Sequence, residues 1–267
     1  MKKFFLKVVN KFIYIFFSIY DFIYYVRLTK EEDYNQKQNQ FFYNLNLNRK
    51  KAIKKFHRIV NQHRYLKTEL SSEHQIFFSA LSFKKNIKSI LEIGTYDGKN
   101  SAYMAELFPS AKVVTIDLPD DDELYINSYS RQNKIFRDNF CKNRDNIIKK
   151  YKNLKFIKMN SLKLINHQAI YDLIWVDGAH GYPFVSIDIV NSLKLLSKKG
   201  ILICDDIYTK TRQNHKLYKS IAGFETLEAL KLAKIIKYKL LYKRIDSKIN
   251  SNPYENKFIA IIKKINT

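Results

Sequence analysis

The stretch Ser89–Gly98 reads SILEIGTYDG, and the organisation of the chain can be read outward from it. Ile90, Leu91 and Ile93 are apolar and typical of a buried strand. A turn of small and polar residues follows, and the apolar spacing of Lys99–Leu107 predicts a helix. A strand, a glycine-containing turn and a helix in this order open a nucleotide-binding α/β sheet.

Two glycines define the expected turn. Gly94 can adopt backbone angles that other residues avoid, and it lets a ligand approach the main chain closely. Gly98 lies where the next helix begins, so free N–H groups and the helix dipole can face a polar ligand. The alternative is a tight turn that binds no ligand.

An acidic residue accompanies the glycines. Glu92 precedes the first of them, and Tyr96 stands where a dinucleotide fingerprint has its second glycine. A carboxylate suits a ligand that carries an ammonium group better than one that carries phosphates. The pattern E-x-G-x-x-x-G resembles motif I of the class I S-adenosylmethionine-dependent methyltransferases. This resemblance implies that Glu92, Gly94, Thr95 and Gly98 contact the cofactor S-adenosylmethionine.

The composition leaves two interpretations of the charge open. The 267 residues are 46% hydrophobic, which allows a sizeable core, and the formal net charge is +23. Such a charge is compatible with a nucleic-acid or anionic-membrane surface. Lysine, asparagine, isoleucine, tyrosine and phenylalanine are all abundant, however, which also indicates a biased proteome with lysine as the default surface residue. The isolated Cys141 and Cys204 indicate a reducing compartment, without zinc or disulfides.

Residues 1–30 are predicted to form an amphipathic helix. Its apolar residues recur at steps of three and four and form a broad aromatic and aliphatic face. Lys11 and Asp21 interrupt the apolar run, whereas a membrane-spanning helix needs ~20 apolar residues. The helix therefore either lies on a membrane surface, which would make a cytoplasmic protein peripheral to the membrane, or packs on a partner chain or on the body of the protein.

The remaining chain divides into two predicted parts. Residues 31–86 form a linker with lead-in helices, and residues 87–267 form the methyltransferase domain. The polar segment Glu31–Asn48 is expected to be a linker or a loose helix. Helical spacing predicts helices within Arg49–Lys67 and His74–Lys85.

From Lys88 onward, strand and helix patterns alternate, which predicts an α/β fold with helices on both faces of a mostly parallel sheet. The expected strands are Ser89–Ile93, Lys112–Ile116, Lys155–Met159, Leu173–Val176, Ile201–Cys204, Ile236–Arg244 and Phe258–Lys263. The expected helices are Ser101–Leu107, Phe136–Lys150, Phe184–Leu196 and Ile221–Lys231. The short link between the last two strands requires them to be antiparallel neighbours. A Rossmann-like sheet of seven strands that ends in an antiparallel hairpin is the sheet of class I methyltransferases.

Polar residues follow the second and third expected strands. Asp117 ends the stretch VVTID, where an acidic side chain can accept hydrogen bonds from both ribose hydroxyls. Asn160 and Ser161 end the stretch FIKMNS, where the family often has an acidic and then a small residue against the adenine. An asparagine amide can still hydrogen-bond an adenine edge. Each residue could instead only cap a turn.

Residues 171–188, YDLIWVDGAHGYPFVSID, contain the strongest local signal. A buried strand places Asp177 at its carboxyl end, and His180 follows three residues later. The next strand, ILICDD, places Asp205 and Asp206 at the same edge. Three converging carboxylates repel one another unless something cationic lies among them. Oxygen-only ligands suit Mg²⁺.

This group of residues resembles the metal-dependent small-molecule O-methyltransferases, especially the D-x-x-H enzymes that methylate sugar hydroxyls. The resemblance implies that Asp177, Asp205 and Asp206 bind Mg²⁺ and that the metal lowers the pKa of the substrate hydroxyl. It also implies that His180 is the general base, with Asp177 beside it in the catalytic group.

The sequence thus predicts an S-adenosylmethionine-dependent O-methyltransferase that acts on a hydroxyl group of a small molecule or a glycan sugar. Contact with nucleic acid is not expected, and a homo-oligomer is compatible with the sequence. Two alternatives remain open, which are an RNA methyltransferase that uses the basic surface and a non-catalytic binding scaffold of the same fold.

Overall fold

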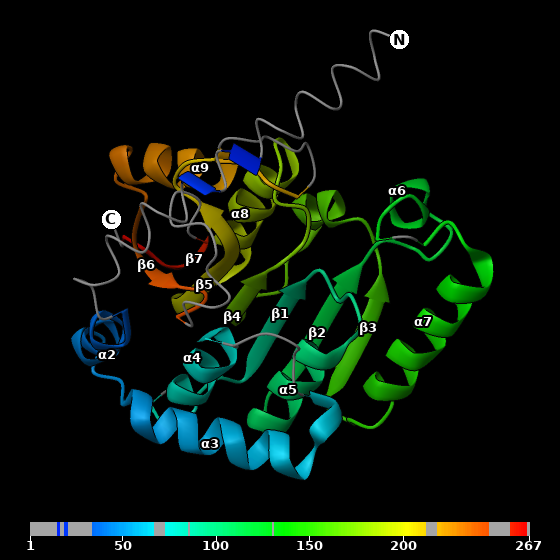
Figure 1. The fold of residues 1–267 in the computed structure, drawn as a ribbon, viewed down its shortest axis with the longest axis horizontal. Coiled ribbons are helices and arrows are strands. Elements are labelled where there is room, and N and C mark those ends of the chain that lie inside the picture. The colour runs from blue at the N-terminus through cyan, green and yellow to red at the C-terminus, as the bar shows by residue number, and fades with distance from the viewer. Residues whose placement is uncertain are drawn as a thin grey trace, which may run out of the picture.

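The strand β1 (Ser89–Ile93) is an interior strand, the third from one edge of the sheet, in the computed structural model (Figure 1). Four of its five residues are buried, because neighbouring strands and helices cover it on all sides, and this explains its nearly continuous apolar sequence. The structure describes residues 15–16, 19–20, 34–66, 73–84, 86–129, 131–211, 218–245 and 257–265.

Seven strands of the described residues form one sheet. The other strands are β2 (Lys112–Asp117), β3 (Leu154–Lys158), β4 (Tyr171–Val176), β5 (Leu196–Tyr208), β6 (Ile236–Tyr242) and β7 (Lys257–Lys264). Their order in the sheet is β3-β2-β1-β4-β5-β7-β6. The strands from β3 to β5 pair in parallel, whereas β7 pairs antiparallel with both β5 and β6. The predicted Rossmann-like sheet with an antiparallel end is therefore confirmed.

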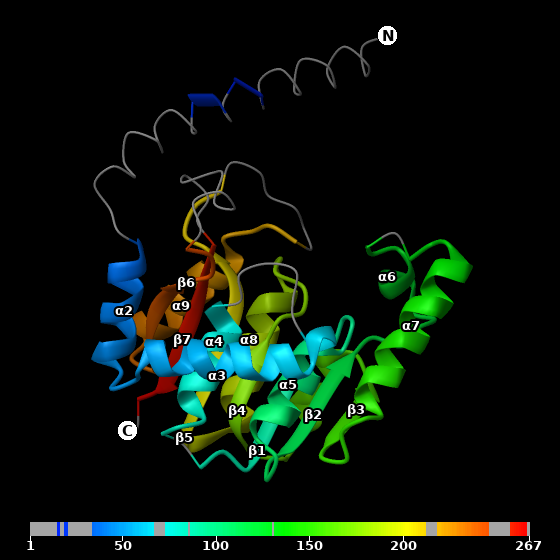
Figure 2. The ribbon, with the colours of Figure 1, turned by 60° about the horizontal axis from the view of Figure 1, so that its bottom comes forward.

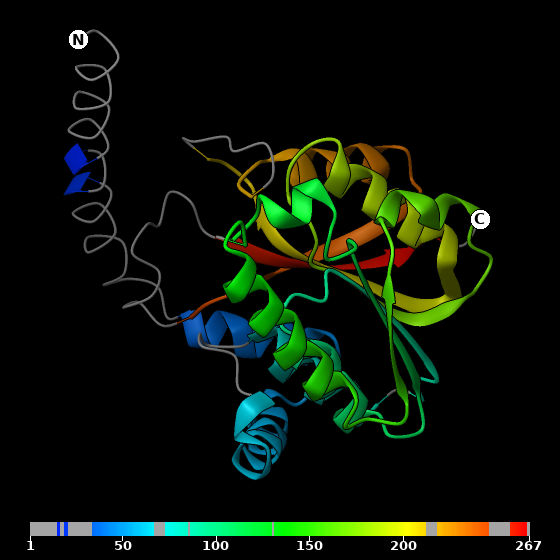
Figure 3. The ribbon, with the colours of Figure 1, turned by 90° about the vertical axis from the view of Figure 1, so that its right-hand side faces the viewer.

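Helices cover both faces of this sheet. They are α2 (Tyr34–Asn44), α3 (Arg49–Gln62), α4 (Glu73–Leu81), α5 (Lys99–Leu107), α6 (Glu123–Ile126), α7 (Lys134–Ile148), α8 (Phe184–Leu195) and α9 (Ala222–Leu232), with the 3-10 turns η1 (Arg64–Leu66) and η2 (Ser161–Asn166). One hydrophobic cluster packs α2, α3, α4, α5 and the end of α7 against one face of the sheet. A second cluster packs η2, α8 and α9 against the opposite face. Figure 2 shows α3, α4 and α5 in front of the sheet, and Figure 3 shows the sheet between the two layers of helices.

The lead-in helices belong to the core of the protein. Phe42 of α2, Phe56 of α3 and Phe77 of α4 lie in the same buried cluster as Ile90 of β1. The segment expected to be a linker or a loose helix contains α2, whose buried residues are Gln38 and Phe42. The helices before residue 87 therefore help to cover the sheet.

Strand β5 is much longer than predicted. It begins at Leu196 and ends at Tyr208, so Asp205 and Asp206 lie inside the strand instead of after it. The extension beyond Cys204 exists because β5 continues to pair with β7 after a register shift between Cys204 and Ile207, and at its start Leu196 pairs with Tyr171 of β4.

The predicted amphipathic helix over residues 1–30 lies outside the described residues, except for Ile15, Phe16, Ile19 and Tyr20, which are helical and exposed. Its contact with a membrane surface or a partner stays a prediction. In the described part of the chain, no helix combines the length and the apolar character needed to cross a bilayer.

Candidate active site

The carboxyl ends of the central parallel strands border a cavity of about 870 Å³. This size is within the usual range for small-molecule sites. Ten of the residues singled out from the sequence line it, and they are Glu92, Gly94, Thr95, Asp117, Asn160, Ser161, Asp177, His180, Asp205 and Asp206. The topology therefore brings together side chains that are up to 114 residues apart in the sequence (206 − 92).

Gly94 joins the ends of three strands. Its backbone has a φ of +97°, and a Cβ atom here would lie 2.2 Å from the carbonyl oxygen of Asp177. The Gly94 N–H donates to the Ile116 carbonyl at 2.9 Å, and the Asp177 N–H donates to the Ile93 carbonyl at 2.8 Å. Only glycine permits this close approach of β1 to β4, and it leaves the main chain of the turn open toward the cavity.

A different structural requirement explains the glycine at position 98. It precedes α5 with a φ of +75°, and a Cβ atom here would lie 3.2 Å from Cγ1 of Ile148 on α7. Gly98 is not among the described residues that line the cavity. The structure thus explains this glycine by its backbone angle and by helix packing, and its contact with a cofactor stays a prediction.

Glu92 is buried at the end of β1 in a hydrogen-bonded group. Its Oε2 accepts from the Thr115 hydroxyl at 2.6 Å, and its Oε1 accepts from the Asn100 amide at 2.9 Å. The Thr115 hydroxyl also shares a hydrogen bond of 2.6 Å with the Thr95 hydroxyl. Burial raises the pKa of Glu92 to about 7. The hydrogen bonds with Thr115 and Asn100 hold the Glu92 side chain in one orientation beside the cavity.

Asp117 and Asn160 organise the two neighbouring strand ends. Asp117 accepts from the N–H of Tyr96 at 3.0 Å and from the N–H of Leu118 at 2.8 Å. Burial raises its pKa, although these two donors oppose the shift. Asn160 accepts from the N–H of Leu162 at 3.0 Å and so caps η2. Both side chains line the cavity, and their contacts to ribose and adenine stay predictions.

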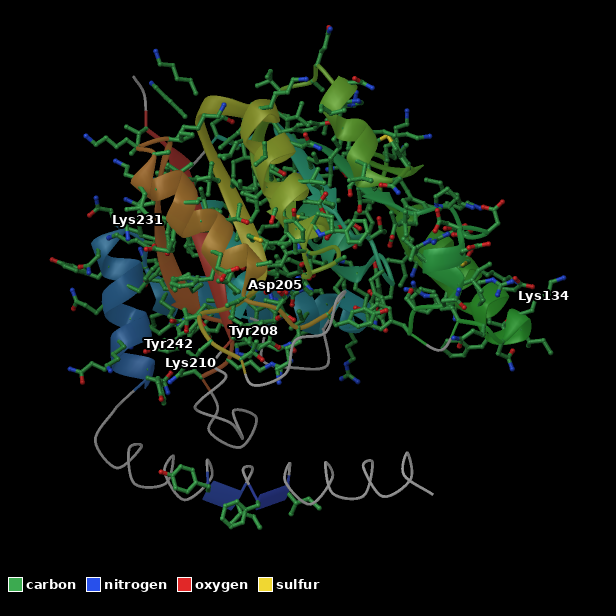
Figure 4. The ribbon with its side chains drawn as sticks, turned by 90° about the horizontal axis from the view of Figure 1, so that it is seen from above. Lys134, Asp205, Tyr208, Lys210, Lys231 and Tyr242 are labelled. Atoms are coloured by element: carbon green, nitrogen blue, oxygen red, sulfur yellow. The ribbon has the colours of Figure 1, made fainter. Side chains whose placement is uncertain are left out.

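A bulge in β5 directs two consecutive acidic residues to the cavity. In a regular strand, neighbouring side chains point to opposite faces. Here the pairing with β7 is interrupted between Cys204 and Ile207, and Asp206 has a φ of +48°. This irregularity lets both Asp205 and Asp206 line the same cavity. Figure 4 places Asp205 near the middle of the molecule, with Tyr208 farther along the same strand.

Two lysines from the C-terminal strands neutralise these carboxylates. The Lys243 ammonium donates to Asp205 Oδ2 and to Asp206 Oδ1, each at 2.5 Å. The Lys257 ammonium donates to Asp206 Oδ2 at 2.7 Å. Burial alone would raise the pKa of Asp206, but the nearby Lys243 holds it well below the ordinary value. Both aspartates are therefore held in ion pairs with lysine.

His180 lies beside the same group. Its Nε2 is 3.8 Å from Asp177 Oδ1 and 3.8 Å from Asp206 Oδ2, and only 10% of its side chain is exposed. Burial lowers the pKa of His180, whereas burial and the neighbouring Asp205 carboxylate raise the pKa of Asp177. The structure thus brings together Asp177, His180, Asp205 and Asp206, as the sequence predicted.

The predicted Mg²⁺ site is not confirmed. Mg²⁺ takes about six oxygen ligands. Three of the four carboxylate oxygens of Asp205 and Asp206 already accept from lysine, and the fourth, Asp205 Oδ1, is buried without a hydrogen-bond partner among the described residues. Across the described ranges, no group of three or more His, Cys, Asp and Glu residues could hold a metal ion. This donor set therefore does not fit a divalent cation.

Sequence reasoning missed several residues of the cavity wall. Lys243 and Lys257 were not selected, because lysine is abundant everywhere in this chain. His74 of α4 stacks on Trp175 with ring centroids 5.3 Å apart, and burial lowers its pKa to about 4. Asp188 of α8 is 1% exposed, and burial raises its pKa to about 6. No local motif marks Lys243, Lys257 or His74, and Asp188 was not selected although it ends the stretch 171–188.

An aromatic group closes the side of the cavity next to β2. The Arg131 guanidinium lies 4.0 Å from the ring centroid of Tyr125 and 4.8 Å from that of Phe140. The rings of Tyr96 and Tyr129 are 5.4 Å apart and also surround it. Tyr125, Tyr129 and Arg131 lie between β2 and α7, whereas Tyr96 lies in the turn after β1 and Phe140 belongs to α7. Tyr218, which lies between β5 and α9, also lines the cavity.

The donor set at the other side of the cavity fits S-adenosylmethionine. An open glycine turn lies between the buried carboxyl of Glu92 and the half-buried carboxyl of Asp117, at adjacent strand ends. A carboxylate beside the first glycine suits an ammonium group, and one at the end of the second strand suits ribose hydroxyls. The space is also large enough for a nucleoside with an amino-acid tail.

Comparison with known proteins gives one family match. The family profile described as "Methyltransferase domain" matches residues 91–207. Among proteins with curated functions, none matches this sequence.

Several solved structures have a similar course of the chain. The O-methyltransferase TomG from Streptomyces achromogenes, involved in tomaymycin synthesis, is 13% identical, with 85% of this chain and 96% of that chain covered and a TM-score of 0.49. The methyltransferase PaMTH1 from Podospora anserina is 18% identical, with 80% and 88% covered and a TM-score of 0.49. The O-methyltransferase from Bacillus cereus is 15% identical, with 80% and 90% covered and a TM-score of 0.48.

The strand order and the antiparallel end of the sheet agree with the profile match. Residues 91–207 are therefore similar to a methyltransferase domain in sequence, and they contain the parallel part of a Rossmann-like sheet.

Proposed function

We propose that this chain is an O-methyltransferase that methylates a hydroxyl group of a small molecule, such as a sugar, with His180 as the general base. The observation that carries the proposal is the position of His180. It lines the same cavity as Glu92 and Asp117, and its Nε2 lies 3.8 Å from each of two carboxylates. A buried imidazole between carboxylates suits the removal of a hydroxyl proton.

Each group in the cavity has a role in this proposal. Glu92, Gly94 and Asp117 hold the cofactor, and S-adenosylmethionine supplies an electrophilic methyl group when it is bound. His180 takes the proton of the acceptor hydroxyl at Nε2. The ionised carboxylate of Asp206, 3.8 Å from Nε2, stabilises the imidazolium that results, because an opposite charge nearby favours the protonated form, and Asp177 on the other side orients the ring. Asp205 Oδ1, which is buried without a partner among the described residues, accepts a second hydroxyl of the acceptor.

Magnesium has no step in this proposal, because lysine ammonium groups already pair with three of the four carboxylate oxygens of Asp205 and Asp206. Positioning of two reactants and stabilisation of charge are sufficient to supply much of the rate enhancement of such a transfer.

The test is a substitution of the base. The variant His180→Ala should lose methyl transfer by a factor of about 10² to 10⁴ in kcat, the usual contribution of a general base. Transfer of labelled methyl from S-adenosylmethionine is measured with a panel of saccharides and catechols as acceptors. Calorimetry should give unchanged binding of S-adenosylhomocysteine, because His180 is not assigned to the cofactor.

The matched control is His57→Ala, which removes an exposed histidine from α3. Full activity of His180→Ala would remove the base assignment. Failure of the unmodified protein to bind S-adenosylhomocysteine would remove the proposed function as a whole.

A further inference from the structure

The place expected for a divalent cation contains a side chain of the protein. Lys243 follows β6 directly, and Lys257 begins β7. The Lys243 N–H donates to the Lys257 carbonyl at 3.1 Å, so the two lysines are cross-strand neighbours. Strand β7 in turn pairs with the end of β5, where Tyr208 lies opposite Lys257. The C-terminal hairpin thus delivers two cations to the bulge that carries Asp205 and Asp206.

The ion pairs are buried. Side-chain exposure is 15% for Lys243, 2% for Asp205 and 10% for Asp206. Two ammonium groups balance two carboxylates, and each bond is at most 2.7 Å long. Removal of one partner from a buried ion pair leaves an uncompensated charge, which is strongly unfavourable. A metal ion that entered this site would have to displace Lys243 and leave its ammonium in a largely buried place.

We propose that the Lys243 ammonium takes the place of a divalent cation between Asp205 and Asp206, so that methyl transfer by this chain requires no metal. This inference rests on the proposed function for its consequence in catalysis. In this arrangement Lys243 is a positioning residue. It holds Asp206 at the distance at which that carboxylate faces Nε2 of His180.

The decisive measurement is Mn²⁺ binding, which needs neither cofactor nor acceptor. Mn²⁺ has the same preference for oxygen ligands as Mg²⁺, and its free form has a strong electron paramagnetic resonance signal. Addition of the full-length protein should leave this signal unchanged. The variant Lys243→Ala frees the oxygens of both aspartates, and its affinity for Mn²⁺ should exceed that of the unmodified protein roughly tenfold or more.

Two further variants separate charge from folding. Lys243→Arg keeps a cation at the site and should not bind Mn²⁺. Lys239→Ala removes an exposed lysine from β6 and should behave as the unmodified protein. Circular dichroism checks that each variant is folded. If Lys243→Ala does not fold, the titration of the unmodified protein and of Lys243→Arg still decides the question.

Binding of Mn²⁺ by the unmodified protein, or failure of a folded Lys243→Ala to bind more Mn²⁺, would overturn the inference. Once an acceptor is found, methyl transfer should persist after exhaustive treatment with EDTA, and its loss would also overturn it. A protein that binds neither Mn²⁺ nor S-adenosylhomocysteine would contradict the proposed function and leave the assignment of Lys243 standing, so the two failures are distinguishable.

Discussion

At the scale of single residues, the buried carboxyl of Glu92 links the cofactor site to stability. Its pKa is about 7 in the folded protein, because burial penalises the charged form, and 4.5 without that burial. The folded state therefore binds more protons than the unfolded state between these two values. The free energy of unfolding therefore falls as the pH rises through this window. The decrease is complete above pH 7.

Replacement of the Glu92 carboxyl should remove this decrease in the free energy of unfolding at high pH. The variant Glu92→Gln should be more stable than the unmodified protein at pH 8 by as much as about 3 kcal/mol, with a smaller difference at pH 5. Urea denaturation at the two pH values measures this. The matched control Glu225→Gln changes an exposed carboxyl in α9 and should shift neither value. An equal effect of Glu92→Gln at both pH values would contradict the assigned cause.

The site residues that could be predicted are those inside local motifs. Glu92, Gly94 and Asp177 were found because each ends or follows a strand with a recognisable turn. Lys243 and Lys257 could not be found in this way. They reach the site only because β6 and β7 fold back against β5, and a lysine carries little information in a chain with 48 Lys and Arg residues.

At the scale of elements, the order and type of most helices and strands followed from apolar periodicity. The boundaries of β5 did not, because the continuation beyond Cys204 depends on pairing with β7 and on a bulge. Helix α2 was expected to be loose because its sequence is polar. In the structure its one buried polar side chain, Gln38, forms specific bonds to other elements.

Gln38 joins α2 to α4 and to the end of β6. Its Nε2 donates to Glu73 Oε2 and to the Tyr242 carbonyl, each at 2.9 Å, and its Oε1 accepts from the Tyr242 N–H at 3.2 Å. Tyr242 immediately precedes Lys243. These hydrogen bonds therefore fix the end of β6, which positions the Lys243 ammonium group.

The variant Gln38→Ala should destabilise the protein by about 1–3 kcal/mol, because it leaves buried polar partners without hydrogen bonds. It should also speed amide hydrogen exchange at Tyr242. The exposed Gln40, whose amide bonds only to Asn44 of the same helix, gives the control Gln40→Ala. Equal exchange rates at Tyr242 in both variants would show that α2 does not hold this strand end.

At the scale of the whole molecule, the cavity is assembled from distant parts of the chain. Its wall includes His74 before the sheet, residues from the ends of β1, β2, β4 and β5, and Lys257 at the start of the last strand. The two hydrophobic cores lie on the faces of the sheet, so the edge with the cavity is not closed by apolar packing. A ligand in the cavity binds a site that the unfolded chain cannot form.

Cofactor binding should therefore stabilise the entire fold. S-adenosylhomocysteine at a hundredfold excess over its Kd should add about 2.7 kcal/mol to the free energy of unfolding. For a chain of this size, that corresponds to a rise in Tm of roughly 5–10 °C. Differential scanning calorimetry measures the shift. Asp117→Ala should reduce it at the same ligand concentration, because the assigned ribose contact is lost, whereas Asp121→Ala, at an exposed position, should leave it unchanged. An undiminished shift in Asp117→Ala would mean that the nucleoside binds elsewhere than at the end of β2.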